Sequence, residues 1–243
     1  MRVRTERVGG LGCRLVGPSP RQAKAGLVLM HGFGAPGDDL VPLAQELLYR
    51  APDLKDVLMV FPEAPIDLGA MAPSARAWWM IDIARIQAHR SGGLDALKRL
   101  RSEEPNGLSV ARGALESVLS VLASEGLPWS RTVVGGFSQG SMLATDVTLR
   151  APQSPAGLAI LSGTLICETA WRQHAALHKG LRVFQSHGTD DVVLPFLNAE
   201  ALRELLSDAG LAVEFFKFSG GHTIPSESVA GLVSLVRRAA EQP

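Results

Sequence analysis

A serine lies between two glycines at a spacing that suits nucleophilic catalysis. It is the central residue of Gly136-Phe137-Ser138-Gln139-Gly140, which matches the pattern G-x-S-x-G. The apolar residues before it are typical of a buried strand, and those after it have helical spacing. A chain that passes from strand to helix this sharply leaves little room for side chains two positions either side of the serine. The pattern therefore predicts a reactive Ser138 that projects from a strand-to-helix turn.

A serine hydroxyl needs a base that takes its proton, and the base needs a carboxylate that orients it. His222 directly follows the last predicted strand, and the neighbours Asp190 and Asp191 directly follow the strand before it. Because parallel strands end at the same edge of a sheet, we expect these side chains to lie near Ser138. The residues themselves do not decide between Asp190 and Asp191. His187 also follows a buried strand, and we expect it to support the acidic loop rather than to act as the base.

A glycine-rich loop follows an early predicted strand, and it has two interpretations. The segment G-F-G-A-P-G at 32–37 is a literal G-x-G-x-x-G, so Gly32, Gly34 and Gly37 could hold the pyrophosphate of NAD. However, Asp38 and Asp39 place two negative charges at the start of the next helix, where that pyrophosphate would bind. An NAD site is therefore the weaker interpretation, and the aspartates are better explained as helix caps.

The second interpretation of the same loop is an oxyanion hole. Glycines allow a main chain to approach a reacting group closely. The backbone N–H of Phe33, together with that of Gln139 beside the serine, could then face the negative oxygen of a tetrahedral intermediate. We favour the oxyanion hole. We place a purely structural turn second and an NAD site third.

Short apolar runs alternate with longer amphipathic stretches along the chain, which is typical of a mostly parallel sheet covered by helices. The predicted strands are 11–16, 26–31, 57–61, 132–137, 157–161, 181–186 and 212–218. The predicted helices are 38–50, 108–125, 139–150, 197–209 and 226–241. No linker-like segment divides the sequence, so we expect a single α/β domain over residues 1–243.

Composition excludes several other classes of protein. Lysine and arginine number 24, as do aspartate and glutamate, so nothing marks a nucleic-acid-binding arm. The apolar runs are far shorter than a membrane span, and arginines and glycines interrupt the N-terminus before a secretory apolar core can form. Cys13 and Cys167 lack metal-ligand spacing and are expected to be buried free thiols. We therefore expect a cytoplasmic protein without integral membrane association.

Residues 62–106 depart from the alternation and predict a long insert that covers or lines the active site. The insert begins with a tryptophan-bearing apolar part and continues with a charged part, in which Lys98, Arg99 and Arg101 are expected to face water. Apolar residues of the insert and of the loops at the same edge are candidates for the substrate pocket, with ordinary core packing as the alternative. These candidates are Trp78, Trp79, Met80, Leu194, Phe196 and Ile224.

Four segments together resemble the phospholipase/carboxylesterase family, which includes the acyl-protein thioesterases. They occur in the order of that family, and they are L-M-H-G-F-G-A-P-G-D-D-L (29–40), G-F-S-Q-G (136–140), H-G-T-D-D (187–191) and G-H (221–222). The resemblance implies an α/β-hydrolase fold without a cofactor. Together with the break in alternation at 62–106, it leads us to expect an α/β-hydrolase with an insert after an early strand, and we expect no metal site. The resemblance also implies Ser138 as nucleophile, Asp191 as orienting acid and His222 as base, with Phe33 and Gln139 as oxyanion donors.

Two features depart from the pattern of the family. Val192 stands where the family often has a proline after the acid, and the 62–106 insert is longer than in short members. The expected function is that of a serine carboxylesterase that hydrolyses ester or thioester bonds of small molecules through an acyl-enzyme. The alternatives are an NAD-dependent oxidoreductase and a non-catalytic binding module on a hydrolase scaffold. We expect a monomer or a homodimer that does not bind nucleic acid.

Overall fold

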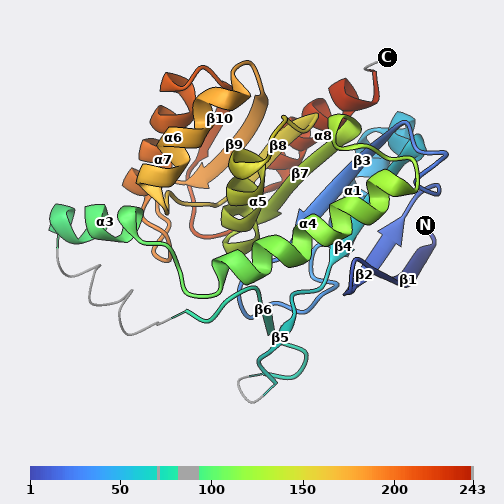
Figure 1. The fold of residues 1–243 in the computed structure, drawn as a ribbon, viewed down its shortest axis with the longest axis horizontal. Coiled ribbons are helices and arrows are strands. Elements are labelled where there is room, and N and C mark those ends of the chain that lie inside the picture. The colour runs from blue at the N-terminus through green and yellow to red at the C-terminus, as the bar shows by residue number, and fades with distance from the viewer. Residues whose placement is uncertain (70–71, 82–92, 242–243) are drawn as a thin grey trace.

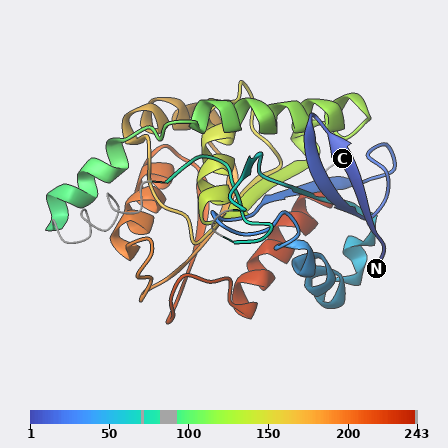
Figure 2. The ribbon, with the colours of Figure 1, turned by 90° about the horizontal axis from the view of Figure 1, so that it is seen from below.

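The computed structural model describes residues 1–69, 72–81 and 93–241, with only the backbone for 93–97. An eight-stranded sheet runs through the molecule in the order β1-β2-β4-β3-β7-β8-β9-β10, with helices on both faces (Figures 1 and 2). The pairs β1/β2 and β2/β4 are antiparallel, and all other neighbours are parallel. The predicted fold class, a mostly parallel sheet flanked by helices, is confirmed.

All strands of the sheet except β1 match the predicted apolar runs closely, because most of them are buried on both faces. Their bounds are β1 (Val3–Val8), β2 (Leu11–Val16), β3 (Ala25–Met30), β4 (Val57–Pro62), β7 (Thr132–Phe137), β8 (Gly157–Leu161), β9 (Arg182–Gly188) and β10 (Ala212–Phe218). A separate two-stranded ribbon, β5 (Ile66–Asp67) and β6 (Arg76–Ala77), lies within the predicted insert.

The first strand, β1, was not among the predicted strands. It lies at the edge of the sheet, pairs only with β2, and carries three arginine or glutamate side chains among its six residues, Arg4, Glu6 and Arg7. Charged side chains on an edge strand discourage pairing with another chain, but they also remove the apolar pattern that identifies a strand. Its place in the sheet follows from pairing with β2, which no local pattern reveals.

The helices divide between the two faces of the sheet. Alternate residues of β3 belong to different apolar clusters: Val28 and Met30 pack with α4, α5, α6 and α7, whereas Leu27 and Leu29 pack with α1 and α8. Figure 2 shows α4 on the side of the sheet opposite α1 and α8. The helix bounds are α1 (Val41–Arg50), α3 (Gly93–Ser102), α4 (Leu108–Ser124), α5 (Gln139–Arg150), α6 (Glu168–Ala175), α7 (Phe196–Asp208) and α8 (Ser226–Ala240).

A buried carboxylate joins three of the helices. Asp146 of α5 accepts hydrogen bonds from Arg112 of α4 at 2.6 Å, from Arg150 at 2.9 Å and from the indole of Trp171 of α6 at 2.8 Å. The side chain of Asp146 is fully buried, so these donors replace the hydrogen bonds that its carboxylate would make with water. Glu104 bridges the two arginines from the end of the insert, so the same cluster anchors the chain that leaves α3.

Both cysteines are free and buried, and burial raises the pKa of the Cys13 thiol to about 11 and that of Cys167 to about 12. Such thiols stay protonated and unreactive near neutral pH. No helix within the described part of the chain is long and apolar enough to cross a membrane.

Candidate active site

Ser138 occupies a strained turn between β7 and α5. Its backbone has φ 54° and ψ −120°, a conformation that side chains other than glycine rarely adopt. A Cβ atom on Gly140 would overlap the carbonyl of Met30, and one on Gly136 would overlap the backbone of Gly140. The two glycines of the motif are therefore needed because β3 and the first turn of α5 pack directly against the turn.

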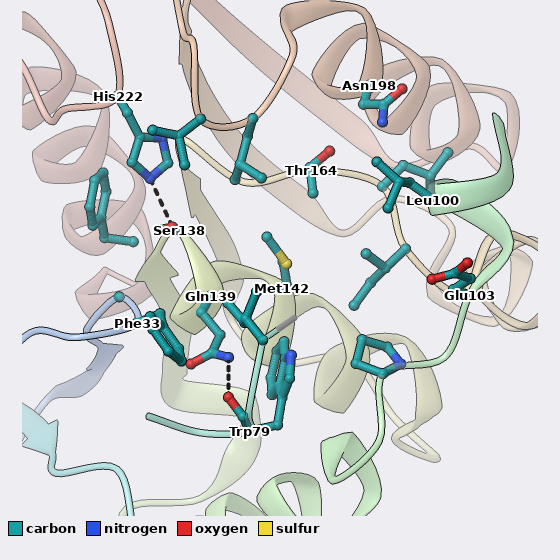
Figure 3. Close-up of a pocket in the computed structure, with 18 of the residues that line it drawn as sticks. Phe33, Trp79, Leu100, Glu103, Ser138, Gln139, Met142, Thr164, Asn198 and His222 are labelled. Carbon is teal, nitrogen blue, oxygen red and sulfur yellow. Dashed lines mark hydrogen bonds between the residues drawn. The ribbon is translucent and has the colours of Figure 1, made fainter. Parts of the chain in front are cut away.

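Two hydrogen bonds link the serine to a carboxylate through a histidine. The hydroxyl of Ser138 lies 2.8 Å from Nε2 of His222 (Figure 3). Nδ1 of His222 lies 2.7 Å from Oδ2 of Asp191. The three residues follow β7, β9 and β10, which end at the same edge of the sheet because the strands between Ser138 and His222 are parallel. The arrangement can move a proton from the hydroxyl to the imidazole.

The carboxylate of Asp191 has four hydrogen-bonding neighbours. Its Oδ1 accepts from the backbone N–H groups of Val193 and Leu194, both at 2.8 Å. Its Oδ2 lies near the rings of His187, at 3.2 Å, and His222. Burial opposes the charge of Asp191, but these hydrogen bonds outweigh burial and hold the pKa of the carboxyl below its usual range. Asp191 is therefore ionised and fixed in orientation.

The neighbouring carboxylate of Asp190 has a different environment. Asp190 is exposed, and its Oδ2 accepts from the backbone N–H of Gly220 at 3.0 Å. Its backbone N–H in turn donates to the carbonyl of Gly220. Asp190 thus ties together the loops that carry Asp191 and His222, and only Asp191 contacts the histidine.

The backbone of the glycine-rich loop lies against the serine. A Cβ atom on Gly32 would be 3.3 Å from Cβ of Ser138. The backbone N–H groups of Phe33 and Gln139 donate to no backbone carbonyl among the described residues, and Gln139 begins a helix, where N–H groups lack helical partners. Phe33 and Gln139 both line the cavity beside Ser138, and Figure 3 shows both below Ser138. The arrangement suits binding of a negative oxygen.

The side chain of Gln139 has a structural task of its own. Its Oε1 accepts from the backbone N–H of Trp78 at 3.0 Å, and its Nε2 donates to the carbonyl of Trp79 at 2.9 Å. The residue that follows the nucleophile therefore holds the tryptophan segment of the insert against the site. The sequence motif does not reveal this contact, because the position of Gln139 in the motif is variable.

In the glycine-rich loop at 32–37, other parts of the protein occupy a backbone N–H group and space that a pyrophosphate would need. The N–H of Gly34 donates to the carbonyl of Arg76, and the space in which a Cβ of Gly37 would lie is filled by the side chain of Glu63. Glu63 pairs with Arg76 at 3.0 Å, so the loop is tied to β6 through both residues. An acidic side chain where a phosphate would bind does not favour the NAD interpretation.

An apolar cavity of about 540 Å³ opens beside Ser138 and His222. Of the six predicted pocket residues, Trp79, Met80 and Leu194 line it. The described part of the insert contributes further wall residues, whereas residues 70–71 and 82–92 of the insert lie outside the described part of the chain. The remaining apolar and polar wall residues include Phe33, Ile81, Leu100, Glu103, Pro105, Asn106, Met142, Thr164, Leu165, Ile166, Val193 and Asn198.

The other three predicted pocket residues lie elsewhere in the structure. Trp78 is 1% exposed, packs in the core and donates its indole N–H to the carbonyl of His31. Phe196 stacks on Phe215 of β10, with ring centroids 6.0 Å apart. Ile224 packs in the cluster of α1 and α8, on the other face of the sheet. Trp78, Phe196 and Ile224 therefore fit the alternative interpretation, in which they pack against neighbouring residues and do not line the substrate pocket.

Several wall residues were not identified from the sequence. Met142 lies one turn after Ser138 on α5, so helical spacing from the nucleophile was a usable signal for it. Ile166 and Asn198 carried no such signal, because their place depends on how the loop after β8 and the start of α7 fold back.

Arg101 corrects another expectation. Lys98 and Arg99 are exposed as expected, but Arg101 is half-buried. It donates from Nε to Oδ1 of Asn198 at 2.7 Å and from its second nitrogen to the carbonyl of Leu197 at 3.1 Å. Arg101 therefore docks the end of α3 on the start of α7, a tertiary contact that helical spacing does not predict.

Comparison with known proteins places the chain among hydrolases. A model of the family described as Phospholipase/Carboxylesterase matches residues 11–238. Acyl-protein thioesterase 1 of Eremothecium gossypii is 31% identical over 223 residues, 88% of this chain and 88% of that protein. A probable carboxylesterase of Oryza sativa subsp. japonica is 28% identical over 243 residues, 94% of this chain and 84% of that protein. The crystal structure of esterase PE8 has a TM-score of 0.76 at 25% identity and covers 98% of this chain and 100% of its own.

Proposed function

Because the chain belongs to the phospholipase/carboxylesterase family of α/β-hydrolases and is a serine hydrolase, we propose that it cleaves carboxylic esters or thioesters through an acyl-enzyme on Ser138. The observation that carries the proposal is the unbroken pair of hydrogen bonds from Ser138 to His222 and from His222 to Asp191, 2.8 Å and 2.7 Å long. A serine at a strained turn with a base in contact is the arrangement that acyl transfer requires.

In the first half of the reaction, Oγ of Ser138 attacks the acyl carbon while its proton passes to Nε2 of His222. The N–H groups of Phe33 and Gln139 stabilise the negative oxygen that develops on the acyl group. Asp191 accepts from Nδ1 of His222, so the imidazole keeps the orientation and tautomer it needs and its positive charge is balanced. The intermediate collapses when His222 gives the proton to the leaving alcohol or thiol.

In the second half of the reaction, water replaces the leaving group. His222 takes a proton from the water, the hydroxide attacks the acyl carbon, and the proton returns to Oγ of Ser138 as the acid departs. Each step uses only groups of this chain and water. The apolar cavity beside Ser138 supports binding of an apolar part of the substrate.

Replacing the nucleophile tests the proposal directly. We expect Ser138→Ala to lower kcat for a p-nitrophenyl ester by roughly 10⁴-fold or more. The matched control is Ser117→Ala, because Ser117 is exposed on α4 and, among the described residues, its hydroxyl bonds only the carbonyl of Gly113 in its own helix. Full activity of Ser138→Ala in a folded protein would refute the assignment of Ser138 as the nucleophile. A folded wild-type protein that hydrolyses neither esters nor thioesters would favour the alternative of a binding module on a hydrolase scaffold.

Esters and thioesters remain two candidate substrate classes within the proposal, since one relative is called a thioesterase and another a probable carboxylesterase. A thiol leaves more readily than an alcohol and needs less help from the proton of His222. Paired oxygen esters and thioesters with the same acyl chain would measure the preference as a ratio of kcat/KM.

A further inference from the structure

One wall of the cavity carries an amide whose two ends have different surroundings. Asn198 lies in the first turn of α7, is 2% exposed and lines the cavity. Its Oδ1 accepts from Nε of Arg101 at 2.7 Å. A guanidinium group can only donate, so the amide must present its oxygen, and not its nitrogen, to Arg101. The Nδ2 group therefore faces the opposite way, toward the other wall residues, as Figure 3 shows.

The Nδ2 group of Asn198 is a hydrogen-bond donor in mainly apolar surroundings. The wall of the same cavity includes Leu100, Leu165 and Ile166. Among the described residues, no side chain or carbonyl is seen to accept a hydrogen bond from this nitrogen. A ligand that covers such a donor without accepting from it displaces water and leaves the donor unpaired, whereas a ligand atom that accepts from it is favoured.

Thr164 adds a second polar group to the same cavity. Its side chain lines the cavity, and its hydroxyl has no hydrogen-bond partner among the described residues. Figure 3 shows Thr164 between His222 and Asn198. The hydroxyl itself is enclosed by protein. The wall remote from Ser138 is therefore less apolar than a pocket for a plain alkyl chain requires.

We propose that the substrate carries a hydrogen-bond acceptor oxygen on its chain, as a hydroxyl, carbonyl or ether group, which Nδ2 of Asn198 binds while the ester lies at Ser138. This inference rests on the proposed esterase function and specifies its substrate class. An all-methylene chain in the same place removes water from the amide and supplies no acceptor, so the site disfavours it. The oxygen can belong to the acyl part or to the alcohol part, and the chemistry of recognition is the same.

The test is a series of p-nitrophenyl and alkyl esters of constant chain length in which one ether oxygen is moved along the chain. One arm places the oxygen in the acyl part, and the other places it in the alcohol part. Every member has nearly the same cost of removing the oxygen from water, so a maximum of kcat/KM at one position measures the hydrogen bond. We expect such a maximum in one arm, roughly tenfold above its neighbouring positions.

Asn198→Asp is the decisive variant, because a carboxylate keeps an oxygen for Arg101 and replaces the donor by a second acceptor. We expect this variant to lose the maximum. The matched control is Gln173→Glu, which makes the same change from amide to carboxylate at an exposed residue of α6 outside the cavity wall and is expected to keep the maximum. If Asn198→Asp does not fold, Asn198→Leu removes the donor at similar volume.

The outcomes separate this inference from the function on which it rests. p-Nitrophenyl acetate has no chain and reports on the catalytic residues alone. Hydrolysis of the acetate with a flat profile in both arms overturns the inference and leaves the esterase function intact. A maximum that survives Asn198→Asp also overturns it. Failure of the wild-type protein to hydrolyse the acetate overturns the esterase function and this inference together.

Discussion

Two histidines approach the same carboxylate oxygen of Asp191, but their roles differ. His187 donates from Nε2 to the carbonyl of Leu194 at 2.9 Å, so its proton resides on Nε2, and its Nδ1 has no partner among the described residues. His187 is fully buried and contacts Asp191 without reaching Ser138. His222 contacts both. The base of the proposed mechanism is therefore His222, and His187 helps to hold Asp191 in place.

The first prediction concerns the two adjacent aspartates. We expect Asp191→Asn to lower kcat by about 10⁴-fold, as loss of the carboxylate does in the serine protease triad, because the amide cannot balance a charged imidazole. We expect Asp190→Asn to keep kcat within a few-fold, since an amide oxygen can still accept from the N–H of Gly220. The measurement is kcat for an aryl ester at saturating concentration. A larger loss in Asp190→Asn than in Asp191→Asn would contradict the assignment.

A second prediction at this scale concerns His31, which fixes the loop that carries Phe33. Nε2 of His31 accepts from the N–H of Ala64 at 3.1 Å, and Nδ1 donates to the carbonyl of Gly32 at 2.8 Å. Burial lowers the pKa of His31 below its ordinary value of 6.5. The unfolded chain then binds more protons than the folded protein between these two pKa values. The stability due to the neutral form is therefore complete above about pH 6.5 and falls as the pH decreases toward the folded pKa.

The comparison of wild type with His31→Asn measures this effect. The variant keeps a donor for the carbonyl of Gly32 but loses the bond to Ala64. We expect it to be less stable at pH 8 and to depend less on pH below 6.5. Burial also lowers the pKa of His178, which leaves a slope of the same sign in both proteins. Equal slopes of unfolding free energy against pH in the two proteins would show that His31 does not titrate as described.

At the scale of elements, the turn between β7 and α5 depends on close contact with β3. The third prediction is that Gly140→Ala destabilises the protein by about 1–3 kcal/mol and reduces activity, because the added methyl group overlaps the backbone of Met30 and His31. Gly113→Ala is the control: Gly113 is exposed within α4, with no atom within 4 Å of an added Cβ. We expect that change to stabilise the protein by about 0.5–1 kcal/mol. Denaturant unfolding measures both, and equal effects would contradict the packing argument.

The sequence predicted the elements whose burial is uniform. β7 and β8 have the expected bounds, because strands covered on both faces are continuous apolar runs and their ends are abrupt. β10 also has the expected bounds, although it is an edge strand and only partly buried. The helices α3 and α6 were missed. They are short, with low apolar content, and α3 is held through tertiary contacts of Arg101. The motifs indicated which residues emerge at one edge of the sheet. They did not indicate Asn198, which lines the cavity and contacts Arg101 where α3 docks on α7.

Hydrogen bonds and ion pairs anchor the insert at 62–106 to the elements around the active site. Gln139 ties Trp78 and Trp79 to the turn, and Glu104 ties the far end of the insert to α4 and α5. Both anchors lie in the described part of 62–106. We propose that the insert selects substrates, because its described residues supply Trp79, Met80, Ile81, Leu100, Glu103, Pro105 and Asn106 to the cavity wall.

At the scale of the whole molecule, the site is assembled from four loops at one edge of the sheet. Phe33, Ser138, Asp191 and His222 come from segments spread over most of the chain, and they meet because β3, β7, β9 and β10 run in parallel. The chain as a whole has no net charge, with 24 basic and 24 acidic residues. Such a balance suits a substrate that is neutral where it binds, as an apolar cavity also does.

The central claim is that Ser138 carries the acyl group during turnover. The most direct measurement is to mix the protein with excess p-nitrophenyl ester, quench in acid before the steady state, and locate the acyl group by peptide mass spectrometry. The account predicts an initial burst of p-nitrophenol and an acyl adduct of the expected mass on the peptide containing Ser138. Hydrolysis with the acyl group on another residue, or a burst with Ser138 unmodified, would contradict it.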